Sequence, residues 1–158
     1  GPELEKLALT GAPMKYPFHS ALNSSAEEAD FSFSGIKTAV VNLMHNAAQK
    51  GETLSKADIA ASFQRAVCDT LTLKAVHAAK EHGFNTLALA GGVSANRALR
   101  SSLARACEEQ GIRFCCPDFR YCTDNAAMIA CAGHYALMAG ELSGLDLNAA
   151  PELPLVQR

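Results

Sequence analysis

The sequence has no apolar run approaching the roughly 20 residues of a membrane-spanning helix, and no secretory leader opens it. It also has little net charge: the formal value is −2 at pH 7, and the pI is near 6.2. A chain so nearly neutral lacks the overall attraction that draws basic proteins to nucleic acid or anionic membranes. We therefore expect a cytoplasmic protein without a membrane partner, in which any contact with RNA uses a local patch or another protein.

Cysteine occurs six times, but never as Cys-x-x-Cys. Cys115 and Cys116 are adjacent, which suits neither a zinc site nor an ordinary disulfide framework. Cys68, Cys107 and Cys131 stand among apolar residues on expected helices, and we expect them to be reduced core residues. The histidines are scattered, and no Ser-His-Asp or His-Glu-x-x-His arrangement supports peptidase chemistry.

The remaining composition is that of an ordinary globular domain. The chain has 158 residues, of which 49% are hydrophobic and 19% charged, enough for one domain with a core. Apolar periodicity and helix-capping signals predict alternating helices and strands. We expect a helix opened by Ser55 and Asp58 and ended by His82-Gly83, and a last helix capped by Thr123. The other expected helices cover residues 2–10, 36–50 and 94–110, the expected strands cover 85–90 and 112–116, and 30–35 form a short strand or an extended loop.

Helices that alternate with strands predict parallel crossovers and a layered α/β fold with flanking helices. Two or three strands are few for a parallel sheet, whose two faces are normally covered. We therefore expect an incomplete sheet whose other strands lie upstream of Gly1. The expected folded part is residues 1–140, followed by a loop-like C-terminal tail over 141–158.

The most informative segment runs from Thr86 to Arg100, where a short apolar run ends at Gly91-Gly92 and a helix follows. Glycine has no Cβ, so a ligand can approach the backbone closely there. A strand, a glycine pair and a helix N-terminus form the phosphate or nucleotide cradle of many α/β proteins. From the glycines alone, a tight turn without a ligand is an equally good interpretation.

Three segments combine residues in an unusual way. They are Asp30-Phe-Ser-Phe-Ser-Gly-Ile-Lys-Thr38, Ala90-Gly-Gly-Val-Ser-Ala-Asn-Arg97 and Cys122-Thr-Asp-Asn-Ala-Ala-Met-Ile-Ala130. In this order and spacing they closely resemble the tRNA N6-adenosine threonylcarbamoyltransferase family, formerly called O-sialoglycoprotein endopeptidase or glycoprotease. The resemblance covers residues 1 to about 140.

The resemblance implies the actin/sugar-kinase/Hsp70-like (ASKHA) fold, in which ligands bind in the cleft between two lobes. The chain is similar to the C-terminal lobe of that fold. The family's His-x-x-x-His metal pair and glycine-rich substrate segment belong upstream of it. We therefore expect the chain by itself to be inactive.

The resemblance also implies binding roles for individual residues, none of them a catalytic acid, base or nucleophile. Asp124 corresponds to the aspartate that holds a metal ion with the two upstream histidines; iron is the expected metal, with zinc or magnesium as alternatives. Asn96 corresponds to the asparagine that contacts the adenosine of the bound adenylate, and Gly91 and Gly92 line the same cleft. Glu5 corresponds to an acidic residue that accepts hydrogen bonds from ribose hydroxyls.

These residues also have ordinary structural interpretations. Gly1-Pro2 matches the end of a substrate-contacting Gly-Gly-Pro turn, but the same pair is a common remnant of tag cleavage. Asp124 would stabilise a helix dipole by about 0.3–1 kcal/mol, and Glu5 and Asn96 would face solvent on helices. Solvated positions are likewise the commoner explanation for Lys37 and for a locally basic region that is otherwise suited to tRNA phosphates. The arginines of that region are Arg97, Arg100, Arg105, Arg113 and Arg120.

By this resemblance, the intact enzyme transfers a threonylcarbamoyl group from threonylcarbamoyl-AMP to the exocyclic amine of the adenosine next to the tRNA anticodon. The amine attacks a mixed anhydride and AMP leaves, while the metal orients the adenylate and stabilises developing charge. Expected partners are tRNA, a paralogous inactive protein of the same fold and a small ATPase, and the chain itself is a candidate homodimer. Two alternatives stay open: an ATP-dependent phosphotransferase or ATPase of the same superfold, and a non-catalytic assembly subunit.

Overall fold

The computed structural model describes residues 1–18 and 30–149. By its internal contacts the chain divides into two units, residues 1–123 and 124–158, and each is described by itself. The predicted division into residues 1–140 and 141–158 stays a prediction. In the described part of the first unit, the elements are α1 (Pro2–Ala8), α2 (Ser34–Lys50), α3 (Lys56–Glu81), β1 (Thr86–Ala88), η2 (Gly92–Ala95), α4 (Arg97–Glu109), β2 (Arg113–Cys115) and η3 (Phe119–Tyr121).

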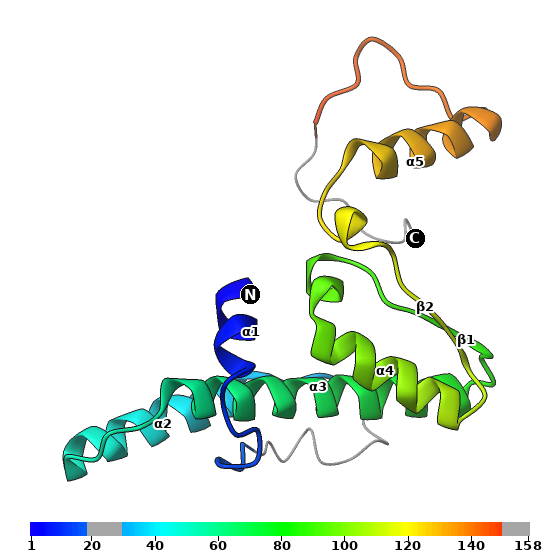
Figure 1. The fold of residues 1–158 in the computed structure, drawn as a ribbon. Helices are drawn as coiled ribbons and strands as arrows, with labels where there is room; N and C mark the ends of the chain where they lie inside the picture. Colours follow the sequence, from blue (N-terminus) through cyan, green and yellow to red (C-terminus); the bar gives the residue numbers. More distant parts are fainter. Residues whose placement is uncertain (19–29, 150–158) are drawn as a thin grey trace. The chain divides into compact units, whose positions relative to one another are not determined.

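Helix α3 is the central element of the first unit, because α1, α2 and α4 all pack against it (Figure 1). It begins at the predicted cap, where Ser55 Oγ accepts a hydrogen bond from Asp58 N at 3.2 Å. It ends at His82-Gly83, where Gly83 has a φ of +69° that favours glycine. Side chains of α3, α4 and the sheet form the main hydrophobic core. Its buried members are Cys68, Val76, Ala79, Leu99, Leu103, Cys107 and Ile112.

Strands β1 and β2 form a two-stranded parallel sheet, with Leu87 opposite Phe114. Helix α4 connects them, which confirms the predicted crossover and makes the chain a small α/β protein. Each strand has three paired residues, fewer than predicted, although the extended backbone continues beyond them. Arg113 N donates to Asn85 O at 2.8 Å, and Leu89 N donates to Cys115 O at 2.9 Å.

The segment that follows α1 is attached to the start of α3. The Asp58 carboxylate accepts a hydrogen bond from Ala12 N at 2.8 Å and pairs with Lys15 Nζ at 2.7 Å. Gly11 lies so close to the Ala57 carbonyl that a Cβ at this position would collide with it. A second, smaller cluster of buried residues lies between α1 and α3. Its members are Ala8, Ala60 and Ala61.

The Asp30–Gly35 motif forms no strand: residues 30–33 are a loop, and Phe33 already has helical backbone angles as the N-cap of α2. Phe31 and Phe33 stack with their ring centroids 6.2 Å apart. Helix α2 begins at Ser34, two residues before the predicted start, and ends at Gly51 as predicted. Lys37 is exposed on this helix.

The second unit contains α5 (Ala126–Met138), and its N-cap is Asn125 rather than the predicted Thr123. The Asn125 side chain accepts a hydrogen bond from Met128 N at 3.1 Å, so the helix starts later than expected. Cys131 is exposed, contrary to its prediction as a core residue, because α5 buries none of its residues. No helix among the described residues is long and apolar enough to cross a bilayer.

Candidate functional site

The predicted order of strand, glycine pair and helix is confirmed from β1 to α4, but the helix starts later than predicted. Gly91 has a φ of +84°, a backbone conformation that favours glycine. The 3-10 turn η2 follows, and α4 begins at Arg97 instead of the predicted Ser94. A Cβ added at Gly91 or Gly92 would meet no atom within 4 Å. Both glycines therefore leave space for a ligand to approach the backbone.

Asn96 ends this loop and caps α4, which explains the later helix start. Its Oδ1 accepts a hydrogen bond from Leu99 N at 2.9 Å, and its Nδ2 donates to Gln64 Oε1 of α3 at 3.0 Å. A side-chain amide has two acceptor lone pairs and two N–H groups, so one of each remains for a ligand. Asn96 is half-buried, and the alternative of a solvent-facing helix residue is wrong.

Glu5 of α1 lies at the same helix start, although 92 residues separate it from its partner there. Its Oε1 accepts a hydrogen bond from Arg97 N at 2.8 Å. A carboxylate at a helix N-terminus also interacts favourably with the helix dipole. Gly1 is the exposed N-cap of α1, and its carbonyl accepts from Glu5 N at 3.2 Å. The structure thus brings Glu5 next to Asn96, while contacts of Glu5 and Gly1 with a substrate stay predictions.

Sequence reasoning does not single out Ser94, and it treats Arg100 as part of a solvated face. Ser94 is fully buried, and its Oγ is a buried side-chain oxygen for which no described residue provides a hydrogen-bond partner. Arg100 donates to the Ser94 carbonyl through Nε and to the Pro117 carbonyl through Nη2 at 2.6 Å. Its guanidinium lies 4.1 Å from the Phe119 ring centroid. Arg100 therefore holds the loop backbone, and its place one helical turn after Asn96 is the sequence signal that could have indicated this.

The other arginines of the predicted basic region are distributed over different elements. Arg97 is exposed at the start of α4, and Arg113 is exposed on β2. Arg120 of η3 pairs with Asp118 at 3.6 Å. Arg105 contributes to a cavity on the α3 side of α4. Contact of these residues with tRNA phosphates stays a prediction.

Asp124 lies in the second unit as an exposed residue, two positions before α5. It directly precedes the N-cap Asn125, so its roles as a metal ligand and as an acid near a helix N-terminus both stay predictions. A carboxylate oxygen suits iron, zinc or magnesium, but a metal ion needs several ligands. Within residues 1–18 and 30–149, no three His, Cys, Asp or Glu side chains lie close enough to hold a metal ion. Asp124 therefore suits one position of a metal site whose other ligands come from elsewhere.

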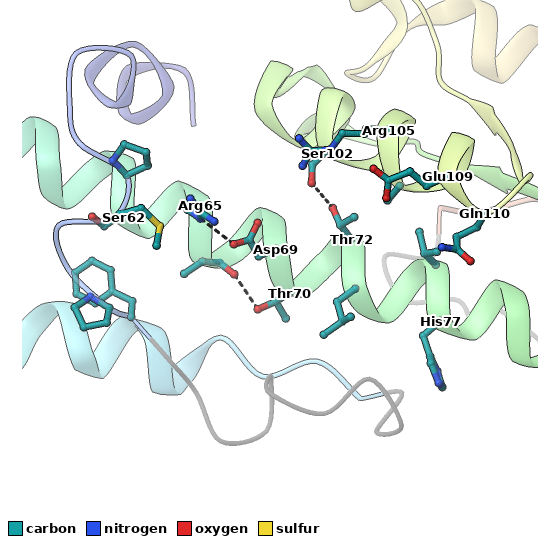
Figure 2. Close-up of a pocket in the computed structure, with 18 of the residues that line it drawn as sticks. Ser62, Arg65, Asp69, Thr70, Thr72, His77, Ser102, Arg105, Glu109 and Gln110 are labelled. Carbon is teal, nitrogen blue, oxygen red and sulfur yellow. Dashed lines mark hydrogen bonds and ion pairs between the residues drawn. The ribbon is translucent and has the colours of Figure 1, made fainter.

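A cavity of about 890 Å³ lies along α3, between residues 13–18 and α4 (Figure 2). None of the predicted site residues lines it. Several polar groups of its wall are already paired: Thr72 Oγ1 donates to Ser102 Oγ at 3.0 Å, and Arg65 pairs with Asp69 at 3.1 Å (Figure 2). A specific ligand needs convergent polar groups that are free to bind it. Asn96 of the β1–α4 loop keeps one N–H and one lone pair for a ligand, so we take this loop rather than the cavity as the candidate site.

Comparisons with known proteins agree with the three sequence motifs. The family tRNA N6-adenosine threonylcarbamoyltransferase matches residues 1–131. Proteins of that name from Caldicellulosiruptor saccharolyticus and Moorella thermoacetica are 45% and 47% identical over 158 and 155 residues, and one from Clostridium botulinum is 42% identical over 158. These alignments cover 98–100% of this chain but only 45–46% of the relatives, so the chain spans about half their length. The predicted resemblance is confirmed, and the chain belongs to the tRNA N6-adenosine threonylcarbamoyltransferase family.

Proposed function

We propose that this chain supplies the adenylate-binding half of an enzyme that transfers a threonylcarbamoyl group from threonylcarbamoyl-AMP to tRNA. The acceptor is the exocyclic amine of the adenosine next to the anticodon. The names of the relatives support the transferred group, the tRNA and the nitrogen that receives the group. The observation that carries the proposal for this chain is the β1–α4 loop. Its two glycines have open space where a Cβ would lie, and its asparagine keeps one N–H and one lone pair for a ligand.

In this proposal the loop binds the nucleotide part of the adenylate. The backbone at Gly91 and Gly92 approaches the phosphate, because no side chain blocks it. The free N–H and lone pair of Asn96 bind the base or the ribose, beside Glu5.

The two-stranded sheet fits the C-terminal lobe of an ASKHA fold in this proposal. Parallel sheets normally have both faces covered and several strands, whereas β1 and β2 pair only with each other. The relatives are about twice as long as the chain, which leaves room for further strands and a second lobe. The same missing half would supply the substrate segment of the cleft.

Asp124 is the proposed metal ligand of this chain, and two histidines of the other half complete the site. Iron is the proposed ion, with zinc or magnesium as alternatives. When bound, the ion supplies positive charge that orients the adenylate and stabilises its oxygens. The further proposed partners are a paralogous protein of the same fold and a small ATPase, with a homodimer of the chain as an alternative assembly. The proposed location is the cytoplasm.

The proposal is tested in the complete protein with tRNA, threonylcarbamoyl-AMP and the partner proteins. Gly92→Val should block the phosphate and lower the transfer rate at least about tenfold, which corresponds to roughly 1.4 kcal/mol of lost binding. Its Cβ meets no atom, so the thermal unfolding midpoint should change little. The matched control, Glu108→Gln, changes an exposed residue of α4 outside the loop and should retain the wild-type rate.

Failure of the wild-type protein to modify tRNA would contradict the proposal. Hydrolysis of ATP by the complete protein, without transfer to tRNA, would favour the phosphotransferase or ATPase alternative. Transfer at an unchanged rate by Gly92→Val would remove the loop from the adenylate site while leaving the family reaction in place.

A further inference from the structure

Two cysteine sulfur atoms contact one guanidinium group on the side of Arg100 that faces the segment after β2. Arg100 Nη2 lies 3.1 Å from Cys122 Sγ, and Nη1 lies 3.5 Å from Cys116 Sγ. The two nitrogens belong to the same planar group, so both sulfur atoms lie next to it. We propose that Cys116 and Cys122 form a peroxide-sensitive thiol pair that closes reversibly to a disulfide.

The two cysteines differ in the way that such a pair requires. Cys116 is exposed, whereas Cys122 is only 2% exposed, and its Sγ donates to Asp118 O at 3.5 Å. Reactive cysteines are typically found in electropositive, partly exposed surroundings, and the guanidinium provides these for Cys116. Cys116 is therefore the thiol that meets a dissolved oxidant. Cys122 is shielded from the oxidant and reacts only with a group that comes from its own neighbourhood.

The chemistry needs a hydroperoxide as the oxidant, and hydrogen peroxide suffices. Cys116, as the thiolate, attacks one peroxide oxygen; the O–O bond breaks, the sulfur becomes a sulfenic acid, and hydroxide leaves and takes the thiol proton as water. The Cys122 sulfur then attacks the Cys116 sulfur, an S–S bond forms, and the hydroxyl group leaves with the Cys122 proton as a second water. Two thiols lose two electrons, and one hydrogen peroxide is reduced to two waters.

The connecting segment allows the two sulfur atoms to approach each other. Between the two cysteines, only η3, a three-residue turn, is regular structure, and four of the five residues are exposed. No strand pairing or α-helix has to be broken for the segment to move. A bond between the sulfur atoms would end the contacts of Arg100 with the two free thiols. Arg100 also holds the Ser94 and Pro117 carbonyls, so oxidation reaches the β1–α4 loop.

The other four cysteines of the chain serve as controls. Cys115 is exposed and adjacent to Cys116, but of these two only Cys116 contacts Arg100. Burial raises the pKa of the Cys68 thiol to about 11, and it also raises the pKa of Cys107. These two thiols should therefore stay unmodified while the chain is folded. Cys131 is exposed in the second unit and provides a further control.

The test is peroxide titration of the full folded chain, followed by blocking of free thiols and mapping of tryptic peptides without reduction. Trypsin cleaves after Arg113 and Arg120, so residues 114–120 and 121–158 separate unless a disulfide joins them. We expect these two peptides to be the main cross-linked pair and dithiothreitol to separate them. Cys116→Ser or Cys122→Ser should abolish the pair, whereas Cys115→Ser and Cys131→Ser should retain it.

A second measurement does not depend on the disulfide. Iodoacetamide should label Cys116 faster than Cys115 in the folded chain and at the same rate in urea. A main disulfide through Cys115 or Cys131, a disulfide between two chains, or oxidation of Cys116 to the sulfinic acid without any cross-link would each overturn the proposal. So would equal labelling of Cys115 and Cys116 in the folded chain. None of these outcomes depends on the transferase function proposed above.

Discussion

Asn96 uses its side chain for the protein before any ligand arrives. Its Oδ1 caps α4, and its Nδ2 donates to Gln64 of α3. Asn96 therefore fixes the end of the β1–α4 loop. The N–H and the lone pair of Asn96 that remain are therefore held in a defined direction. A binding group that is already ordered loses less entropy when a ligand arrives.

The capping role of Asn96 and its proposed role in nucleotide binding can be separated by two substitutions. Asn96→Ala removes the cap and should lower the free energy of unfolding by about 0.5–2 kcal/mol. Asn96→Ser retains a capping oxygen and should cost much less, since serine caps helices as well as asparagine does. Both variants should lose nucleotide affinity, because neither has an amide. Urea unfolding followed by circular dichroism, together with calorimetric titration of AMP into the complete protein, checks this; equal stability of the two variants would contradict the capping role.

A pair of glycines with opposite surroundings gives a second test at the residue scale. Gly11→Ala places a Cβ against the Ala57 carbonyl and should destabilise the first unit by about 1–3 kcal/mol. Gly92→Ala places a Cβ in open space and should leave stability within about 0.5 kcal/mol of the wild type. Thermal unfolding measures both. A smaller loss for Gly11→Ala than for Gly92→Ala would show that the α1–α3 connection is looser than described.

At the scale of elements, one ion pair connects the segment after α1 to the first turn of α3. The hydrogen bond from Lys15, together with that from the Ala12 backbone, holds the pKa of the Asp58 carboxyl below its usual value near 3.8. The same hydrogen bond from Asp58 raises the pKa of the Lys15 ammonium. Because the pKa of Asp58 is lower in the folded state, its stabilisation is present above about pH 4 and is lost as the pH falls through the lowered value.

Acid should therefore weaken the wild-type protein through this carboxylate. We expect the urea midpoint to fall as the pH drops below about 4 and through the lowered pKa of Asp58, and to fall less steeply in Asp58→Asn, which cannot titrate there. The chain has no tryptophan, so circular dichroism is the suitable measurement. Asp69→Asn is a control, because its pair with Arg65 is more exposed and joins residues of the same helix. Identical pH profiles for wild type and Asp58→Asn would refute this account.

Local sequence signals predict most of the helix boundaries. They do not predict contacts between residues that are far apart in the sequence. Ser55 and Gly83 bound α3 as expected, because caps depend on neighbouring residues alone. Helical spacing predicts a start of α4 at Ser94, but residues 92–95 form the separate turn η2, and the Asn96 cap starts α4 at Arg97. The position of Glu5 at Arg97 depends on tertiary packing across 92 residues, which periodicity does not encode.

At the scale of the whole molecule, this chain contains the loop proposed to bind the nucleotide and a single proposed metal ligand. The loop is complete in itself, since α1, α3 and α4 hold its residues through the contacts of Glu5, Gln64 and Arg100. The proposed metal site is incomplete, since no three potential metal ligands lie close together in the described part of the chain. Nucleotide binding and metal binding should therefore respond differently when the chain is separated from the rest of the protein.

The complete protein and the 158-residue chain should differ in metal content. In the complete protein, Asp124→Asn should remove most of the bound iron and the transfer activity, because it removes one ligand of a proposed set of three. Asp118→Asn, an exposed aspartate that pairs with Arg120, should retain both. The chain alone should bind no stoichiometric metal and transfer nothing, while its β1–α4 loop remains folded. Elemental analysis of the purified proteins measures the metal independently of activity, and full iron occupancy in Asp124→Asn would exclude this residue as a ligand.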